Sequence, residues 1–252
     1  MFQKIVSRQT LQISLLFLVI SGFSFGIAAQ TPEQIAPGVW RVRYGEQETT
    51  RPTDFKEPAN SAAMEKMPHA GTAPALLSLL HYVPLQSGIS ASLPLSNAER
   101  LYGFGLQVNS FQQRGLRREI RVNSRTIGNI GFSHAPLPFF ISSNGYGILV
   151  NSSRYVTFYA GSQHRLNRPV AASPNDAANA TKESDLYSGN NGKSDLVEWQ
   201  VKGAKGIEII YFEGPSIKQV MERYNLFSGG GAIPPLWALG FKYRAKNTFD
   251  AN

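Results

Sequence analysis

Carboxylates, histidines and glycine-rich turns are the groups in this sequence that could carry chemistry, and their spacing identifies no catalytic site. The 252 residues include 17 Asp and Glu, but no two of them stand out as an acid–base pair by local sequence. The chain has no cysteine, which excludes disulfides, thiolate nucleophiles, cysteine-based zinc sites and iron–sulfur clusters. Its four histidines are dispersed without the spacing of metal ligands: His69, His81, His134 and His164. A single histidine is more often structural than catalytic, so we predict no catalytic residue, metal site or cofactor.

Two glycine-rich stretches match nucleotide-binding loops only in part. "YGFGLQV", residues 102–108, has two glycines of the dinucleotide motif, lacks the third and opens no helix. "SGGGAIPP", residues 228–235, lacks the Lys-Ser/Thr pair of a P-loop. No serine occupies a nucleophile elbow, the sharp strand-to-helix turn of α/β-hydrolases. Asn151 and Asn179 begin Asn-x-Ser/Thr triplets, which matter only in a host that glycosylates proteins. Chemical motifs alone therefore identify no enzyme class.

The first 29 residues have the features of a secretory signal peptide. Lys4 and Arg8 form a positively charged start, and no further charge follows until Glu33. The apolar stretch ends in small residues that suit signal peptidase near Ala28 or Ala29. An uncleaved membrane anchor is the alternative, because the stretch is nearly long enough to span a bilayer, although several Ser and Gly residues dilute it. We expect an exported protein, periplasmic or extracellular, with no membrane contact after cleavage.

Basic residues exceed acidic ones but are mostly scattered along the chain. Cleavage of the signal segment would lower the formal net charge from +8 to +6, since Lys4 and Arg8 leave with it. The exception is "RGLRREIRVNSR", residues 114–125, which holds five arginines. No aromatic residue lies inside this cluster, so we predict no nucleic-acid surface. We favour a strand with a solvated arginine face; a groove for anionic sugars is an alternative that the sequence does not support.

Composition and apolar pattern predict a turn-rich β protein. Aromatic residues, glycine and proline are abundant (15 Phe, 10 Tyr, 3 Trp, 23 Gly, 15 Pro). Residues 38–45, "GVWRVRYG", alternate between apolar and arginine side chains, as in a half-buried strand. Phe139–Ser142 and Tyr146–Val150 flank Asn144-Gly145, a dipeptide that supplies the positive φ angles of a tight hairpin. Two further strands are expected at 196–201 and 206–214. Residues 46–75 are expected to form a loop or a decoration of the sandwich, and residues 165–195 a long surface loop or insertion.

The pattern changes after Gly214, where apolar residues recur at helical spacing. Pro215 suits the first position of a helix, and a glycine run suits its C-terminal stop. The residues at this spacing are Ile217, Val220, Met221, Tyr224 and Phe227. Pro234-Pro235 then lead into Leu236–Tyr243, which has the composition of a buried strand. This order indicates a β-sandwich followed by the start of an α/β domain; the alternative is that 236–243 is a last strand of the sandwich itself.

Four segments together carry a resemblance to a known family. "ERLYGFGLQVNSFQQRG" matches a Glu…Tyr-Gly-x-Gly…Arg-Gly signature, and "PLPFFISSNGYGILVNSS" matches a Pro-Phe-aromatic strand with a Gly-Tyr-Gly hairpin. "YFEGPSIKQVMERYNLFSGGGAIPPLWALGF" is similar to a junction between a helix and a first barrel strand, and "WRVRY" fits an early strand. The segments cover about half the chain in the order and approximate spacing of glycoside hydrolase family 31. The chain thus resembles the N-terminal region of that α-glucosidase and α-xylosidase family.

The resemblance implies a galactose-mutarotase-like β-sandwich at residues 30–214, after the signal peptide at 1–29. Residues 215–252 would form a linker helix and the incomplete start of a catalytic (β/α)8 barrel. The family uses two carboxylates on later barrel strands, a nucleophile and a general acid, in a retaining mechanism. Neither position is matched here, and Asp250 lies too early in the barrel. We therefore expect a mainly β chain that is inactive by itself; its partners would be the remainder of the barrel and an α-linked oligosaccharide or glycoside.

In the family, a loop of the N-terminal domain reaches the rim of the substrate pocket, and the matching stretch here is residues 122–136. The resemblance makes Asn123, Ser133 and His134 candidates for sugar-facing polar groups. Phe249 corresponds, slightly displaced, to an aromatic position just after the first barrel strand. Ordinary turn residues that cap backbone groups are the alternative for the first three. Because this aromatic position is displaced, the resemblance does not distinguish between glucose, xylose and another α-linked sugar as the substrate.

Two functions from different classes remain. The first is the N-terminal, carbohydrate-binding-type part of an exported retaining α-glycosidase that hydrolyses α-glucosides or α-xylosides. The second is a stand-alone secreted β-sandwich that binds a carbohydrate or a partner. We favour the first, because the apolar barrel-entry segment would have no barrel to bury it in the second.

Overall fold

The computed structural model describes residues 31–123, 130–162 and 193–231, together with residues 235, 236 and 240. The predicted signal peptide, most of the predicted barrel strand and Phe249 lie outside these residues. The strands are β1 Glu33–Ala36, β2 Val39–Gly45, β3 His81–Leu85, β4 Gly88–Pro94, β5 Leu101–Gly105, β6 Leu116–Ile120, β7 Pro136–Ser142, β8 Tyr146–Val150, β9 Val156–Ser162, β10 Lys193–Lys202 and β11 Gly206–Glu213. The helices are the 3₁₀ turns η1 Pro52–Phe55 and η2 Ala75–Leu79, and the α-helices α2 Ser61–Glu65 and α4 Ile217–Phe227.

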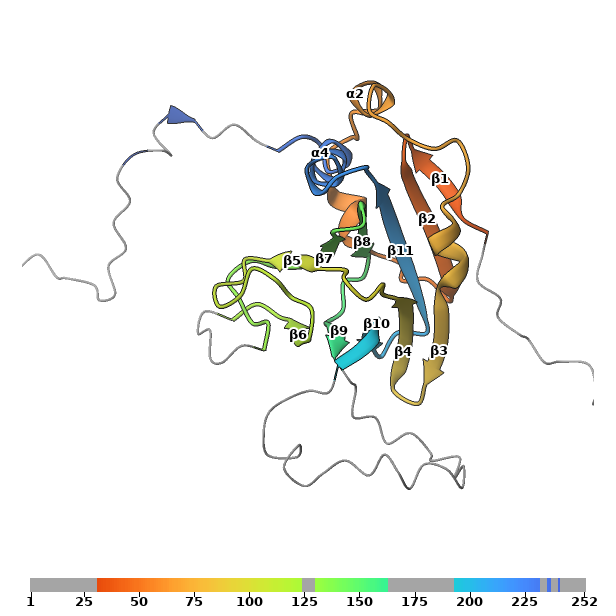
Figure 1. Cartoon of the computed structure of the whole chain (residues 1–252), viewed down its shortest axis with the longest axis vertical. Coiled ribbons are helices and arrows are strands. Elements are labelled where there is room, and N and C mark those ends of the chain that lie inside the picture. The colour runs from red at the N-terminus through yellow and green to blue at the C-terminus, as the bar shows by residue number, and fades with distance from the viewer. Residues whose placement is uncertain (1–30, 124–129, 163–192, 232–234, 237–239, 241–252) are drawn as a thin grey trace, which may run out of the picture.

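The described strands form two antiparallel sheets packed face to face (Figure 1). The larger sheet has the order β1-β2-β11-β8-β7-β5, and the smaller one the order β3-β4-β10-β9-β6. The predicted mainly β sandwich followed by a helix is confirmed. Of the two alternatives for residues 46–75, a loop or a decoration, the second fits the structure, because the segment contains η1 and α2.

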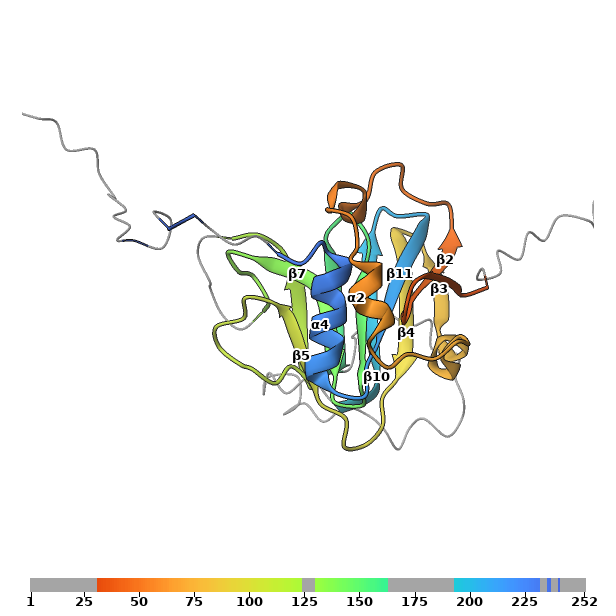
Figure 2. The same ribbon diagram turned by 90° about the horizontal axis from the view of Figure 1, so that it is seen from above.

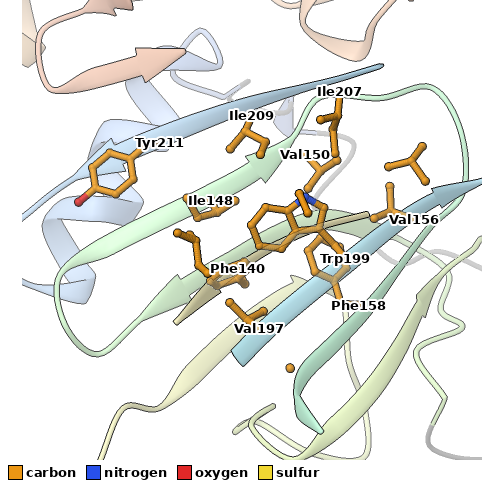
Figure 3. Close-up of a cluster of buried hydrophobic side chains, with 14 of the residues drawn as sticks. Phe140, Ile148, Val150, Val156, Phe158, Val197, Trp199, Ile207, Ile209 and Tyr211 are labelled. Carbon is orange, nitrogen blue, oxygen red and sulfur yellow. The ribbon is translucent and has the colours of Figure 1, made fainter. Parts of the chain in front are cut away.

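The main core lies between the two sheets (Figure 3). Phe140, Ile148 and Ile209 of the larger sheet meet Phe158 and Trp199 of the smaller one, and all five are fully buried. Alternate residues of β2 also point into this core, while its two arginines face the other side, as the sequence pattern predicts.

A second core lies on the outer face of the larger sheet, where α2 and α4 run side by side (Figure 2). Val220 and Phe227 of α4 pack there with Phe139 and Phe212. Gly147 of β8 lets the helix approach, because a Cβ atom at that position would lie 2.8 Å from Val220 Cγ1. The larger sheet is therefore buried on both faces over its central strands.

The start of α4 differs from the prediction. Ser216, rather than a residue before Pro215, is the N-cap, and its hydroxyl accepts a hydrogen bond from the Gln219 amide. Ile217 and Met221, which were expected on the apolar face, are exposed by 38% and 45%. The face that packs on the sheet holds Val220, Tyr224, Phe227 and also Arg223.

Arg223 is fully buried, although no acidic side chain hydrogen-bonds to it among the described residues. Its guanidinium donates to the backbone carbonyls of Glu213 and, at 2.8 Å, of Pro68. Gly38, with φ +68°, passes over it, and a Cβ there would lie 2.6 Å from the Arg223 Cζ atom. Burial lowers the pKa of Arg223, and Glu213 opposes that effect. One side chain thus holds α4, the end of β11 and the segment around Pro68 together.

The hairpin between β7 and β8 is confirmed, with Ser142 opposite Tyr146. Its turn has three residues, however, and only Gly145 takes a positive φ, of +82°. Asn144 does not, so the expectation that this dipeptide supplies positive φ angles is confirmed for Gly145 and wrong for Asn144.

Candidate functional site

The candidate sugar-facing residues lie in two chain segments beside the edge of the sandwich, after β6 and before β7. Val122 and Ser133 form a parallel bridge, and the Asn123 amide donates to the Ser133 carbonyl at 2.9 Å. The Ser133 amide in turn donates to the Arg121 carbonyl at 3.3 Å. We call residues 121–123 and 130–135 the edge loops; the residues between them are outside the described part of the chain.

Hydrogen bonds from two sides hold the edge loops. On one side, the Glu119 amide of β6 donates to the Ile130 carbonyl at 2.7 Å. On the other, the Gln107 side-chain amide donates to the carbonyls of Gly131, at 3.2 Å, and Phe104, at 2.9 Å. Gly131, with φ +102°, has no room for a Cβ, which would lie 2.8 Å from the Glu119 nitrogen. The backbone positions of the edge loops are thus set by neighbours on both sides.

Phe104 explains how the chain reaches these loops. It has a φ of +66°, the one positive value outside glycine among the described residues, and it lies at an irregularity where β5 slips against β7. Its ring is fully buried and packs 4.8 Å from that of Phe158. Packing therefore stabilises an unfavourable backbone conformation that directs residues 105–107 towards the edge loops.

The structure brings three of the four predicted site residues together. Asn123 is half-buried and hydrogen-bonded, while the His134 side chain is exposed. Ser133 is only 1% exposed, and its hydroxyl has no hydrogen-bond partner among the described residues. Phe249 lies outside the described part of the chain. A sugar-facing role for these residues stays a prediction.

Aromatic side chains near the edge loops were not anticipated from the sequence. The Arg121 guanidinium lies over the rings of Phe132 and Tyr155, with its carbon 5.7 Å and 5.4 Å from the ring centres. Tyr155 is 65% exposed. Away from these loops, Phe111 contacts Tyr102 of β5 and is 85% exposed. Phe132 and Tyr155 belong to segments outside 114–125. The composition of 114–125 therefore could not predict that they lie beside its arginines.

The arginine-rich strand is present as β6, but its predicted solvated face is wrong in part. Arg118 is only 1% exposed and points inwards with Ile120. Its Nε donates to the buried Gln113 side chain at 2.6 Å, and burial lowers the pKa of Arg118. Arg117 faces outwards and pairs with Glu119, as expected of a strand with alternating faces.

Glu99, the acidic residue of the "ERLYGFG" signature, is a buried anchor of the β7–β8 hairpin. Its carboxylate accepts hydrogen bonds from the Ser142 and Tyr146 hydroxyls, both at 2.5 Å, and from the Ser96 amide at 2.8 Å. Burial and the bond to this carboxylate raise the pKa of Tyr146 well above its usual range. The signature glutamate thus fixes a turn.

Glu208 is a second buried carboxylate, on the outer face of β11. Arg43 and Arg51 each place a guanidinium nitrogen 2.7 Å from one of its oxygens, and Asn151 donates to the other at 2.5 Å. The Asn151 amide also donates to Thr53 and is 2% exposed. The first Asn-x-Ser triplet is therefore inaccessible to glycosylation in the folded protein, and Asn179 of the second lies outside the described residues.

These two carboxylates cannot serve as a glycosidase pair. Glu99 contacts Tyr146, the first residue of β8, whereas Glu208 contacts Asn151, the residue after its end. Five residue steps along a strand separate the two contacts by about 16 Å. A retaining glycosidase needs its carboxylates about 5 Å apart. Both groups are structural here.

Metal-binding clusters and membrane-spanning helices are both absent from the described residues. In that part of the chain, no cluster of three or more His, Asp or Glu residues could hold a metal ion. No helix there is both apolar enough and long enough to cross a bilayer.

Comparisons with known proteins agree with the geometry. The chain is 26% identical over 154 residues to α-xylosidase XylQ of Lactiplantibacillus pentosus, which is 60% of this chain and 16% of that protein. It is 26% identical over 155 residues to an isomaltosyltransferase of Sporosarcina globispora, or 61% of this chain and 12% of that protein. The chain therefore spans about a sixth or less of the length of these curated relatives. No protein-family model matches it.

Among solved structures, the chain is similar to a family 31 dextranase of Flavobacterium johnsoniae complexed with glucose, with a TM-score of 0.56 and 15% identity. The likeness covers 86% of this chain and 28% of the dextranase. The described residues thus have a β-sandwich fold found in glycoside hydrolase family 31, and the resemblance of this chain to the N-terminal region of that family is confirmed.

Proposed function

We propose that this chain is the N-terminal, carbohydrate-binding-type part of an exported retaining α-glycosidase. Hydrolysis would take place on a (β/α)8 barrel, of which residues 215–252 supply the linker helix and the first strand. The observation that carries the proposal is the likeness of the sandwich to the dextranase structure, together with the small share of the relatives that the chain spans. The sandwich would have no hydrolytic activity of its own, because its two best-buried carboxylates are hydrogen-bonded anchors whose contacts on β8 lie about 16 Å apart along the strand.

The edge loops are the part of the sandwich that would meet the sugar. Asn123, Ser133 and His134 supply polar groups there, and the hydroxyl of Ser133 has an unused hydrogen-bonding capacity. The substrate would be an α-glucoside or α-xyloside, since the relatives are an α-xylosidase, an isomaltosyltransferase and a dextranase. Phe249 would add an aromatic contact from the barrel side.

Activity assays on two forms of the protein test this proposal. One form is the 252-residue chain, and the other is the product of the longest open reading frame that contains its codons. Both are assayed with 4-nitrophenyl α-D-glucopyranoside, 4-nitrophenyl α-D-xylopyranoside and isomaltotriose. We expect hydrolysis only by a product that includes the later barrel strands. Turnover by the 252-residue chain itself would contradict the proposal.

Export is tested separately on the mature protein. We expect the periplasmic or secreted form to begin at residue 29 or 30, as N-terminal sequencing or intact mass would show. A full-length N-terminus in the membrane fraction would favour the uncleaved anchor instead.

A stand-alone carbohydrate-binding or partner-binding sandwich is the second candidate. The exposed rings of Phe111 and Tyr155 favour it, because exposed aromatic faces are suited to stacking on sugars. This function requires a reading frame that carries no barrel and a soluble product that binds oligosaccharide without cleaving it. A frame that continues into barrel strands would exclude it.

A further inference from the structure

A groove lies at the end of the sandwich where β7 turns into β8. It consists of two adjoining pockets of about 460 Å³ and 650 Å³, which share Tyr211 and meet at the Asn144-Gly145 turn. We call it the hairpin groove. Its size lies in the range of small-molecule sites.

The hairpin groove is distant from the edge loops. The groove is at the C-terminal end of β7, beyond Ser142, whereas the edge loops precede its N-terminal end at Pro136. Six residue steps along a strand separate these two ends by about 20 Å. A ligand in the hairpin groove would therefore occupy a separate site.

A fixed backbone segment forms one wall of the groove. Residues 68–75, "PHAGTAPA", cross the end of the larger sheet and contribute mostly Ala, Pro and Gly. The Ala70 amide donates to the Glu213 carboxylate at 2.8 Å, and the Arg223 guanidinium holds the Pro68 carbonyl. The opposite wall is formed by the Asn144-Gly145 turn and Gly214-Pro215. Both walls are attached to the sheet, so the groove is preformed.

Tyr211 points into the groove with an unused hydroxyl. Its side chain is 93% buried, since only 7% of it is exposed, and its ring stacks on that of Tyr146 at 5.8 Å. The hydroxyl points away from the core cluster (Figure 3), and no described residue hydrogen-bonds to it. Because Tyr211 lines both pockets, its unpaired hydroxyl is open to the groove, where a polar group of a ligand could hydrogen-bond to it. Burial, and to a smaller extent Glu213, raise the pKa of Tyr211, which keeps it a neutral donor.

The remaining polar groups of the groove are acceptors or neutral. Glu99 lines one pocket and Glu213 the other. Glu213 accepts one hydrogen bond per oxygen, from Trp40 Nε1 at 2.6 Å and from the Ala70 amide, which leaves about two acceptor positions free. None of the described residues that line the two pockets is Lys or Arg. This combination disfavours anions and suits a ligand with many hydroxyl donors.

We propose that the hairpin groove binds a neutral sugar unit of an α-linked oligosaccharide, as a second saccharide site; naming a saccharide rests on the proposed function. One hydroxyl of the sugar accepts from or donates to Tyr211, and others donate to the free acceptor positions of Glu213. The site would hold a distal part of a long substrate or anchor the protein on a polysaccharide.

The Trp40 indole is a reporter for the groove, because it donates to Glu213. In a ¹H–¹⁵N spectrum of the 252-residue chain, its cross-peak is assigned with a Trp40→Phe variant and followed during titration with isomaltotriose. We expect a saturable shift of this peak. Tyr211→Phe should weaken the dissociation constant by roughly two- to tenfold, as expected for the loss of one neutral hydrogen bond.

Two variants complete the test. Tyr82→Phe is the matched control, because it removes a buried hydroxyl that also lacks a partner but lies outside the groove. It should leave the dissociation constant unchanged. Ala73→Trp, at an exposed position of the wall, should fill the groove and abolish the shift while the melting temperature stays near that of the wild type.

The outcomes separate this inference from the proposed function. If isomaltotriose shifts only peaks of Asn123 and His134, and Tyr211→Phe binds like the wild type, the groove is not a saccharide site and the proposed function stands. If no peak moves at millimolar sugar, carbohydrate binding by this chain fails altogether. An equal loss of affinity in Tyr82→Phe and Tyr211→Phe would also overturn the inference.

Discussion

Gly147→Ala should destabilise the sandwich by pushing α4 off the larger sheet. An added Cβ would lie 2.8 Å from Val220 Cγ1 and 2.9 Å from Phe139 Cε2, closer than real Cβ contacts. Overpacking of this kind costs about 1–3 kcal/mol in the free energy of unfolding. Val220→Ala alone removes two buried methyl groups, worth about 1.6 kcal/mol before any cavity cost.

The double variant carries the test. If Gly147→Ala clashes with Val220, then Gly147→Ala/Val220→Ala relieves the clash, because the new methyl group occupies part of the vacated space. We expect it to be more stable than the sum of the single effects by about 1–2 kcal/mol. Gly71→Ala is the matched control, since nothing lies within 4 Å of its Cβ position, and it should change stability little.

Urea unfolding, followed by tryptophan fluorescence and far-UV circular dichroism, measures the wild type and the four variants. The m-value should stay constant, so that midpoint shifts report stability. Single effects that add to within about 0.5 kcal/mol would refute the reasoning, because independent sites are additive. A Gly147→Ala protein as stable as the wild type would show that α4 does not rest on β8 in this way.

Three more predictions concern the buried and hydrogen-bonded side chains. Glu99→Gln should lower the free energy of unfolding in urea by about 1–3 kcal/mol. The reason is that an amide cannot accept from both hydroxyls at one position and from the backbone amide at the other. Glu57→Gln, at an exposed position, is the control and should change this free energy little. Partial burial raises the pKa of Glu48, but hydrogen bonds from Ser152 and Ser153 outweigh it and hold the pKa below the usual 4.5. The stabilisation by Glu48 is therefore complete above pH 4.5 and lost as the pH falls through the lowered value; Glu48→Gln should flatten the acid limb of stability against pH, and an unchanged limb would exclude this contribution. The pKa of Tyr146 is raised, so its contribution is complete below pH 10 and lost as the pH rises further; absorbance at 295 nm should show tyrosines that ionise only as the protein unfolds, and Tyr146→Phe should remove one of them.

The apolar pattern was enough to predict most strands and the fold class. Strands such as β2 alternate in the way that a half-buried strand must, and the hairpin signal at Asn144-Gly145 located β7 and β8. α2 was missed because five residues with one buried apolar side chain, Met64, give no helical period. The predicted helical face of α4 is right only in part: Ile217 and Met221 are exposed, and Arg223, which the pattern did not include, is buried instead.

The buried arginines show what sequence patterns leave out. A charged residue is expected on the surface, and its burial depends on partners that local sequence does not reveal. Arg118 donates a hydrogen bond to the Gln113 side chain, and Arg223 donates to two backbone carbonyls of distant segments. Because every residue has a backbone carbonyl, the residue types in a sequence do not indicate which carbonyls will pair with a buried arginine.

The candidate site was predicted from family resemblance more than from chemistry. The resemblance located the edge loops, and the structure places Asn123, Ser133 and His134 there together. The hairpin groove had no comparable signal, because its walls combine residues 68–75 with a turn some seventy positions later, and most of them are small or apolar. Only the three-dimensional fold brings an unpaired tyrosine hydroxyl between them.

Arg223 also determines how mechanical load enters the sandwich. Tension on the end of α4 would be transmitted through the guanidinium to the carbonyls of Pro68 and Glu213, and Gly38 packs closely against the same group. α4, the end of β11 and the segment around Pro68 would therefore have to separate together before the helix could leave the sheet. α4 is thus held in one direction on the larger sheet, and under load it would act as a stiff lever rather than as a tether.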